Sequence, residues 1–231
     1  MPFFYDATYI LVLIGAVLSM LASAKVKSTY AKYAQVRSLS GMTGEAAARK
    51  ILSTAGIYDV KVQRVSGDLT DHYDPRNKTL NLSDTVYGST SVAAVGVAAH
   101  ECGHAIQHDR GYAPLRLRSA IVPVANFGAK VSWPLILLGL FLGGSGTLIQ
   151  IGILCFSLAV LFQLVTLPVE FNASSRAVRL LSETGILYEE ELKQTRKVLS
   201  AAALTYVAAA ASSLLQLLRL VLLFGNRRRD G

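Results

Sequence analysis

The sequence predicts a mainly α-helical integral membrane protein that carries a small α+β domain. Hydrophobic residues make up 52% of its 231 residues and charged residues only 16%, against roughly 25% in an ordinary soluble domain. Residues 1–24 and 131–175 contain no Lys or Arg, although the chain has 23 of them. Three of its four histidines lie within nine positions between those windows. This composition excludes a disordered chain and an ordinary soluble enzyme.

The first domain, residues 1–24, is predicted to be a transmembrane anchor. The apolar run Ala7–Ala24 is about 27 Å long as a helix, close to the thickness of the hydrocarbon core. Asp6 precedes the run, and Lys25 and Lys27 follow it. Positive charge marks the cytoplasmic side of a span, and a signal peptide carries it at the opposite end. We therefore expect an uncleaved anchor with its N-terminus outside the cell.

The second domain, residues 25–118, is predicted to be a cytoplasmic α+β domain. Residues 43–52 suit a short helix, and residues 60–65 alternate apolar and polar side chains as a half-buried strand does. A second short strand is expected at Leu80–Leu82, and residues 90–108 form a longer helix that carries the histidines.

The third domain, residues 119–167, is predicted to be a helical hairpin in the membrane. Two apolar stretches are separated by Gly143-Gly144-Ser145-Gly146, and glycine tolerates the positive φ of a tight reversal. Arg116 precedes the hairpin, Arg176 follows it, and its tip is uncharged. Both ends of the hairpin are therefore expected on the cytoplasmic side.

The last domain, residues 168–231, is predicted to contain a helix with a metal ligand and a C-terminal helical region. Its apolar segment, Leu199–Phe224, contains Arg219 and is followed by Arg227–Arg229. A spanning segment would leave those arginines outside, against the charge rule. The favoured expectation is a helix that packs against the catalytic domain or lies in the cytoplasmic interface; a true span is the alternative.

The residues that indicate chemistry are His100, Glu101 and His104, which form an H-E-x-x-H motif. Residues four apart on a helix lie about 40° from each other, so both imidazoles can bind one ion. Glu101 lies about 100° round from His100 and can accept a proton from a zinc-bound water. The alternative is a helix whose histidines serve only in packing and hydrogen bonding.

A catalytic zinc site needs a third protein ligand and an open position. His108 is the local candidate, but three ligands from one straight helix would strain tetrahedral geometry, so a solvent or supporting role suits it better. Glu170 is the only acidic residue between Asp109 and Glu183. It begins a segment at the cytoplasmic end of the hairpin, from which it can face the histidines; the alternative is a solvated helix start.

Four segments together resemble a known family. The whole chain is similar to the YugP-like membrane zinc metallopeptidases of bacteria, which look like compact relatives of the HtpX and CAAX-prenyl-protease group. The resemblance covers nearly all of the chain and depends on Asp71–Pro75, His100–Ala105, Leu167–Ser174 and Ala203–Ala208.

The resemblance implies a gluzincin-type (zincin) catalytic domain at a bilayer. In this family His100 and His104 would be zinc ligands, Glu101 the general base and Glu170 the third ligand. The chain departs from HtpX-type relatives at Ser174, where an acidic residue is usual. This puts in doubt a carboxylate that would orient a ligand histidine.

Further site residues are expected from their position. Such peptidases commonly carry an edge strand that pairs with extended substrate, and Leu80, Asn81 and Leu82 precede the motif helix as that strand would; a buried structural strand is the alternative. His72, Arg176 or Tyr206 can stabilise an oxyanion, although a core or salt-bridge role is the favoured interpretation for each of them.

The sequence thus predicts a multi-pass protein of the cell membrane whose active site faces the cytoplasm. One zinc ion would activate water to hydrolyse membrane-associated or misfolded polypeptides, so the expected partners are a polypeptide and the lipid bilayer. The rival interpretation is a non-catalytic scaffold with a structural zinc. The net charge of +8 does not indicate nucleic-acid binding, because the basic residues flank the apolar segments instead of forming a recognition helix.

Overall fold

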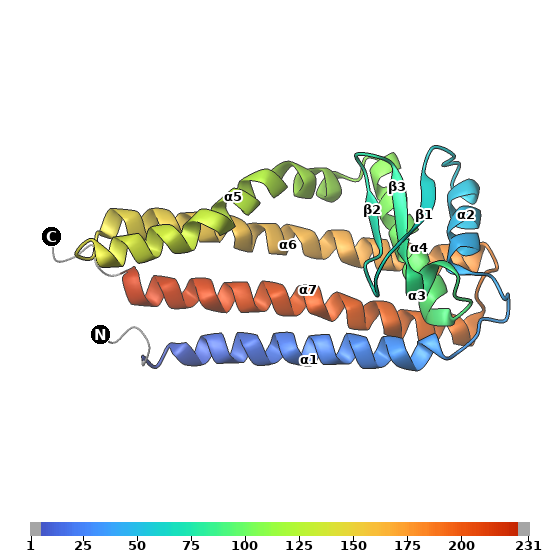
Figure 1. The fold of residues 1–231 in the computed structure, drawn as a ribbon, viewed down its shortest axis with the longest axis horizontal. Helices are drawn as coiled ribbons and strands as arrows, with labels where there is room; N and C mark the ends of the chain where they lie inside the picture. Colours follow the sequence, from blue (N-terminus) through green and yellow to red (C-terminus); the bar gives the residue numbers. More distant parts are fainter. Residues whose placement is uncertain (1–5, 226–231) are drawn as a thin grey trace. The chain divides into compact units, whose positions relative to one another are not determined.

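The computed structural model describes residues 6–225, in which helices predominate over a small sheet (Figure 1). This confirms the predicted fold class, a mainly α membrane protein with a small mixed region. The elements in chain order are α1 (Tyr9–Ala34), α2 (Gly44–Thr54), β1 (Lys61–Val65), β2 (His72–Asp74), β3 (Thr79–Ser83), α3 (Asp84–Tyr87), α4 (Val92–Asp109), α5 (Ala113–Phe141), α6 (Gly146–Glu183) and α7 (Glu189–Phe224).

The chain divides into two compact units, each built from segments that are far apart in the sequence. The apolar unit consists of the described parts of Met1–Ser23 and Thr205–Gly231 together with Leu117–Leu167. The mixed unit consists of Ala24–Arg116 and Pro168–Leu204. The expected division into four consecutive domains stays a prediction.

The apolar unit is a bundle of helices. Within the described residues, α1, α5, α6 and α7 are each long and apolar enough to cross a membrane. The hairpin of α5 and α6 reverses at Gly143 and Gly144, whose φ angles of 72° and 83° suit glycine. A Cβ on Gly128 of α5 would lie 2.6 Å from the carbonyl oxygen of Cys155 on α6, so small residues bring these two helices close together.

The C-terminal part of α7 lies alongside α1 in this unit (Figure 1). Ser212 Oγ donates a hydrogen bond to the Gly15 carbonyl oxygen at 2.8 Å, and Arg219 Nη2 is 3.1 Å from Asp6 Oδ2. Leu220 and Phe224 pack in an apolar cluster with residues of α5 and α6.

The segment Leu199–Phe224 is divided between the two units. Leu199 joins the core of the mixed unit, and residues 205–224 pack with the other apolar helices. Whether the segment spans the membrane stays a prediction. Arg219, the charged residue inside this segment, is 4% exposed and paired with Asp6 within the apolar unit. Arg227–Arg229 lie outside the described residues.

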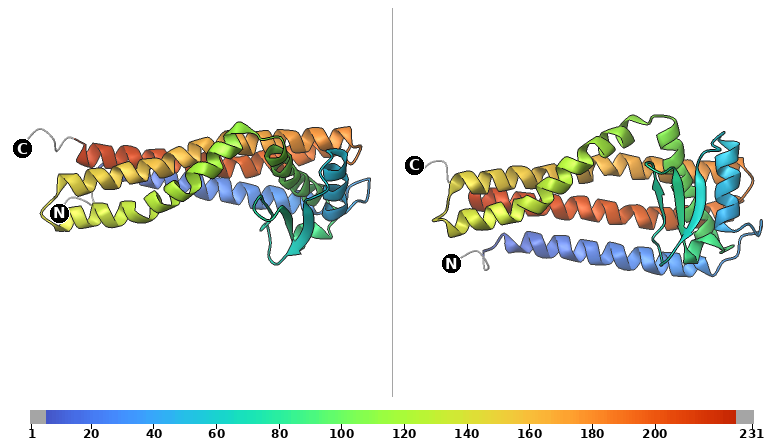
Figure 2. Two further views of the ribbon diagram at one scale, coloured as in Figure 1. Left: turned by 90° about the horizontal axis from the view of Figure 1, so that it is seen from above. Right: turned by 45° about the horizontal axis from the view of Figure 1, so that its top comes forward.

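The mixed unit contains a three-stranded sheet in the order β1-β3-β2, with α2 and α4 packed against it (Figure 2). β1 runs parallel to β3 and β2 runs antiparallel to it. Leu80 and Leu82 of β3 are fully buried in a core that also takes Ile51 of α2 and Leu181 of α6. The sheet therefore fixes α2, α4 and the end of α6 around one hydrophobic core.

The expectation that Leu80, Asn81 and Leu82 form an edge strand is wrong. β3 is the middle strand, and its neighbours β1 and β2 use both of its hydrogen-bonding edges. An extended peptide cannot add to a strand whose two edges are paired. The edges of the sheet are β1 and β2.

We expect the ion pair between Asp6 and Arg219 to stabilise the apolar unit. Arg219→Leu should lower the melting temperature in detergent micelles by a few degrees, because Asp6 loses the cation that faces it. The double variant Asp6→Asn/Arg219→Leu, which removes both charges, should melt closer to wild type. An unchanged melting temperature for Arg219→Leu alone would contradict this role.

Candidate metal centre

Helices α4 and α6 approach closely within the mixed unit. A Cβ on Gly103 of α4 would lie 2.7 Å from the carbonyl oxygen and 3.1 Å from the Cα of Ala173 on α6. Glycine is therefore the residue that fits at this contact. The contact places His100 and His104, one turn apart on α4, opposite Glu170 on α6.

His100, His104 and Glu170 converge on one point. Their donor atoms all lie within 4.8 Å of one another. Glu170 Oε2 is 3.3 Å from His100 Nε2 and 3.5 Å from His104 Nε2, and Glu170 is only 2% exposed. Two imidazole nitrogens and a carboxylate oxygen are donors that zinc prefers, so these residues fit one zinc ion.

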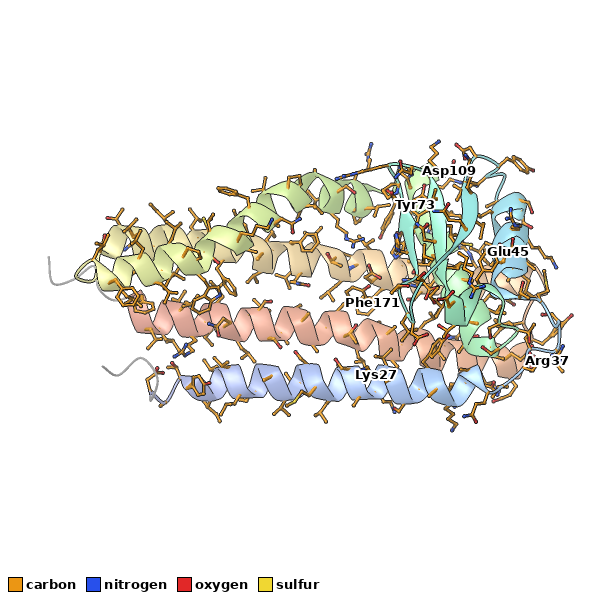
Figure 3. All side chains as sticks on the ribbon, viewed as in Figure 1. Lys27, Arg37, Glu45, Tyr73, Asp109 and Phe171 are labelled. Atoms are coloured by element: carbon orange, nitrogen blue, oxygen red, sulfur yellow. The ribbon has the colours of Figure 1, made fainter. Side chains whose placement is uncertain are left out.

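His108 is not part of this group in the described residues. Its exposed side chain lies 2.9 Å, through Nδ1, from the hydroxyl of Tyr73 on β2. Figure 3 shows Tyr73 near Asp109, at the C-terminal end of α4. Burial, with the charges of nearby carboxylates, raises the pKa of Tyr73 to about 12, so its hydroxyl keeps its proton and can donate to His108. The three-member group is thus separate from the third histidine of the helix.

The other ring nitrogen of each candidate ligand has its own partner. His100 Nδ1 is 3.1 Å from Ser174 Oγ, which places the hydroxyl where the sequence suggested a supporting side chain. His104 Nδ1 is 3.0 Å from Gln107 Oε1. Such contacts orient metal-binding imidazoles and turn Nε2 toward the ion.

Gln107 was missed by the sequence analysis. It lies three residues after His104 on the same helix, a spacing at which side chains meet, and that spacing was the available signal. Its Nε2 donates to the Val169 carbonyl oxygen at 2.9 Å and to Asn172 Oδ1 at 3.0 Å. Arg176 Nε donates to the same Asn172 oxygen at 2.7 Å, so Arg176 belongs to this network.

The carboxylates near His104 create an environment that favours positive charge. Burial alone favours neutral His104, but its hydrogen bond to Glu170 and the charges of Glu101 and Glu170 raise its pKa above the ordinary value. This environment favours positive charge at His104 and so also suits a bound cation. Glu101, next to His100 in the sequence, is 7% exposed. Its negative charge also acts on Asp71. Burial raises the pKa of Asp71, hydrogen bonds from Ser83 lower it, and the charge of Glu101 raises it further.

His72 has hydrogen-bond partners of its own. His72 Nδ1 is 2.9 Å from the Thr70 carbonyl oxygen, and its Nε2 is 3.1 Å from Asn81 Nδ2. Both ring nitrogens are thus engaged within the region of the sheet, which disfavours His72 as a donor to an oxyanion. Tyr206 is on the part of α7 that belongs to the apolar unit, and its role stays a prediction.

Comparisons with known proteins agree with this chemistry. Residues 8–225 match a family described as "Putative neutral zinc metallopeptidase". The chain is 53% identical over 213 residues to "Putative membrane protease YugP" of Bacillus subtilis (strain 168), and the alignment covers 92% of this chain and 94% of that relative. No solved structure matches the chain.

The close approach at Gly103 can be tested with a single methyl group. Gly103→Ala should lower the zinc affinity and cost about 1–3 kcal/mol of stability, because α4 must move away from Ala173. Zinc affinity is measured by competition with a chromophoric chelator, and stability by thermal unfolding. Gly88→Ala is the matched control, since a Cβ there meets nothing within 4 Å. Equal zinc affinities in the two variants would contradict the role of this contact.

Proposed function

Since this chain belongs to the neutral zinc metallopeptidase family whose model it matches, we propose that it is a membrane-embedded endopeptidase that uses one zinc ion. Its membership of that family also confirms the resemblance to YugP-like metallopeptidases. The observation that carries the proposal is the convergence of His100, His104 and Glu170 within 4.8 Å. Three protein ligands leave a coordination position for water, as in catalytic zinc sites.

The donor set suits hydrolysis. Zinc bound by these side chains would lower the pKa of a water towards about 7 and polarise the scissile carbonyl group. Glu170 contributes one negative charge from a buried position and leaves a net positive centre. His100 and His104 would hold the ion through Nε2, because their Nδ1 atoms contact Ser174 and Gln107.

Glu101 is the general base in this mechanism. It follows His100 directly on α4, and its carboxylate acts electrostatically on His104. Its low exposure limits competition from bulk water. Glu101 accepts the proton of the attacking water and returns it to the leaving amine of the cleaved peptide.

The rival function, a scaffold with a structural zinc, needs a fourth protein ligand. His108 was the candidate for that place. Its Nδ1 contacts Tyr73, and it lies outside the group of three donors. This arrangement favours the open site of an enzyme.

The substrate is a polypeptide in an extended conformation. β2 is an edge strand whose Tyr73 contacts the C-terminal part of α4. An extended chain can pair with a free strand edge through its backbone, which makes β2, and not β3, the candidate for substrate pairing. Location at a membrane favours membrane-associated or misfolded polypeptides as substrates.

The active site is proposed to face the cytoplasm of a multi-pass membrane protein. Lys25 and Lys27 at the end of the apolar run support a cytoplasmic position for that end of α1. α7 contacts Asp6, which precedes α1, and Gly15 and Ser19 of α1. These contacts support a crossing by α7 beside a spanning α1. The hairpin and α7 then bring the described chain across the membrane four times.

Glu101→Gln tests the enzymatic proposal. The variant should still bind one zinc ion, because it keeps the three ligands. Its hydrolysis of a fluorogenic unfolded protein should fall by about 10²–10⁴-fold, the usual contribution of a general base. Glu190→Gln, a change of the same kind at an exposed position, should hydrolyse like wild type. Full activity of Glu101→Gln would refute the mechanism.

Single cysteines test the topology in a variant whose Cys155 is replaced by serine; the remaining Cys102 is buried. Cysteines at Ser145, in the hairpin tip, and at Asn226, just beyond the described residues, should react with a membrane-impermeant maleimide added outside intact cells. A cysteine at Ser53 should react only after the cells are opened. Protection of Asn226→Cys in intact cells would contradict a crossing by α7.

A further inference from the structure

Gln107 contacts both helices that carry the candidate ligands. Its side chain is fully buried. Its Oε1 is 3.0 Å from His104 Nδ1 on α4, while its Nε2 is 2.9 Å from the Val169 carbonyl oxygen and 3.0 Å from Asn172 Oδ1 on α6. One amide thus uses its oxygen and both of its N–H groups between the two helices.

These partners fix the orientation of the amide. A backbone carbonyl oxygen can only accept a hydrogen bond, so the Gln107 atom that faces Val169 must be the NH₂ group. The Asn172 side is consistent, because its oxygen also accepts from Arg176 Nε, which can only donate. Oε1 of Gln107 therefore faces His104, and an amide oxygen only accepts. The hydrogen on His104 must lie on Nδ1.

A neutral imidazole has a single N–H, and two acceptors compete for it at His104. Gln107 Oε1 lies beside Nδ1, and Glu170 Oε2 lies 3.5 Å from Nε2. If the hydrogen sat on Nε2, that nitrogen would donate to Glu170 and could not bind a cation. With the hydrogen on Nδ1, the lone pair of Nε2 points toward Glu170 and the place of the ion.

We propose that Gln107 is a positioning residue that selects the His104 tautomer required for metal binding. Through Val169 the same side chain holds the backbone immediately before Glu170, so it aligns two ligands together. His100 lacks an equivalent constraint, because the Ser174 hydroxyl can either donate or accept. The inference rests on the proposed function in taking zinc as the ion, and it assigns Gln107 no contact with substrate.

The tautomer can be read directly in the metal-free protein. The full chain is labelled with ¹⁵N-histidine, purified in detergent micelles and stripped of metal. Ring nitrogen shifts are recorded at a pH at which the imidazoles are neutral. The chain has four histidines, so single substitutions of His72, His100 and His108 assign the His104 signals. His104 should carry its hydrogen on Nδ1; a hydrogen on Nε2 in the wild type would overturn the proposal.

Two variants separate selection of the tautomer from simple packing. Gln107→Leu keeps the bulk but removes the acceptor, so the hydrogen should move to Nε2 and zinc affinity should fall about 10–100-fold. Gln107→Glu keeps an oxygen beside Nδ1 and should retain the Nδ1–H tautomer.

Gln194→Leu is the matched control, the same substitution at a position on α7 of the mixed unit outside the metal group. It should leave the tautomer and zinc affinity unchanged. A Gln107→Leu protein with the wild-type tautomer and a zinc affinity within about threefold of wild type would refute the proposal. If that variant does not fold, the wild-type and Gln107→Glu spectra decide, since an Nε2–H tautomer in either overturns it.

The spectra require neither zinc nor peptide. A protein that has the Nδ1–H tautomer and loses zinc affinity in Gln107→Leu, yet cleaves no polypeptide, would support this inference and refute the proposed function. An active peptidase with His104 in the Nε2–H form would do the opposite.

Discussion

The close contact between Gly103 and Ala173 is the constraint on which the candidate site depends. Because the backbones of α4 and α6 approach closely here, short side chains on one helix can contact those on the other. His100 then meets Ser174 on one side of the contact, and His104 meets Gln107, with Glu170 opposite both imidazoles. A larger residue at the contact would move the ligands apart even if all three ligand residues were kept.

Local spacing made part of the site predictable. His100, Glu101 and His104 follow from the geometry of one helix, and Glu170 stood out as a lone acid in a long stretch without charge. Gln107 did not stand out, because a glutamine on a helix is common and its importance depends on which backbone lies opposite. The contact between Ser174 and His100 became visible only when α6 was placed beside α4.

The incorrect expectation, an edge strand at Leu80–Leu82, concerned the pairing of strands. The apolar alternation at Leu80–Leu82 indicates a strand, but it cannot say whether one or two strands flank it; the neighbour β2 is too short to stand out in the sequence. The partner of Arg219, Asp6, also lies far away, at the other end of the chain. In both cases the partner becomes visible only in the tertiary structure.

The order of the ligands along the chain has a consequence for biosynthesis. A ribosome releases both imidazoles before the lipid-buried hairpin, whereas the carboxylate emerges only after the second arm of that hairpin. The three donor side chains can therefore hold a metal ion together only after residue 170 has been synthesised. In the proposed peptidase, both arms of the hairpin precede the completed ligand set along the chain.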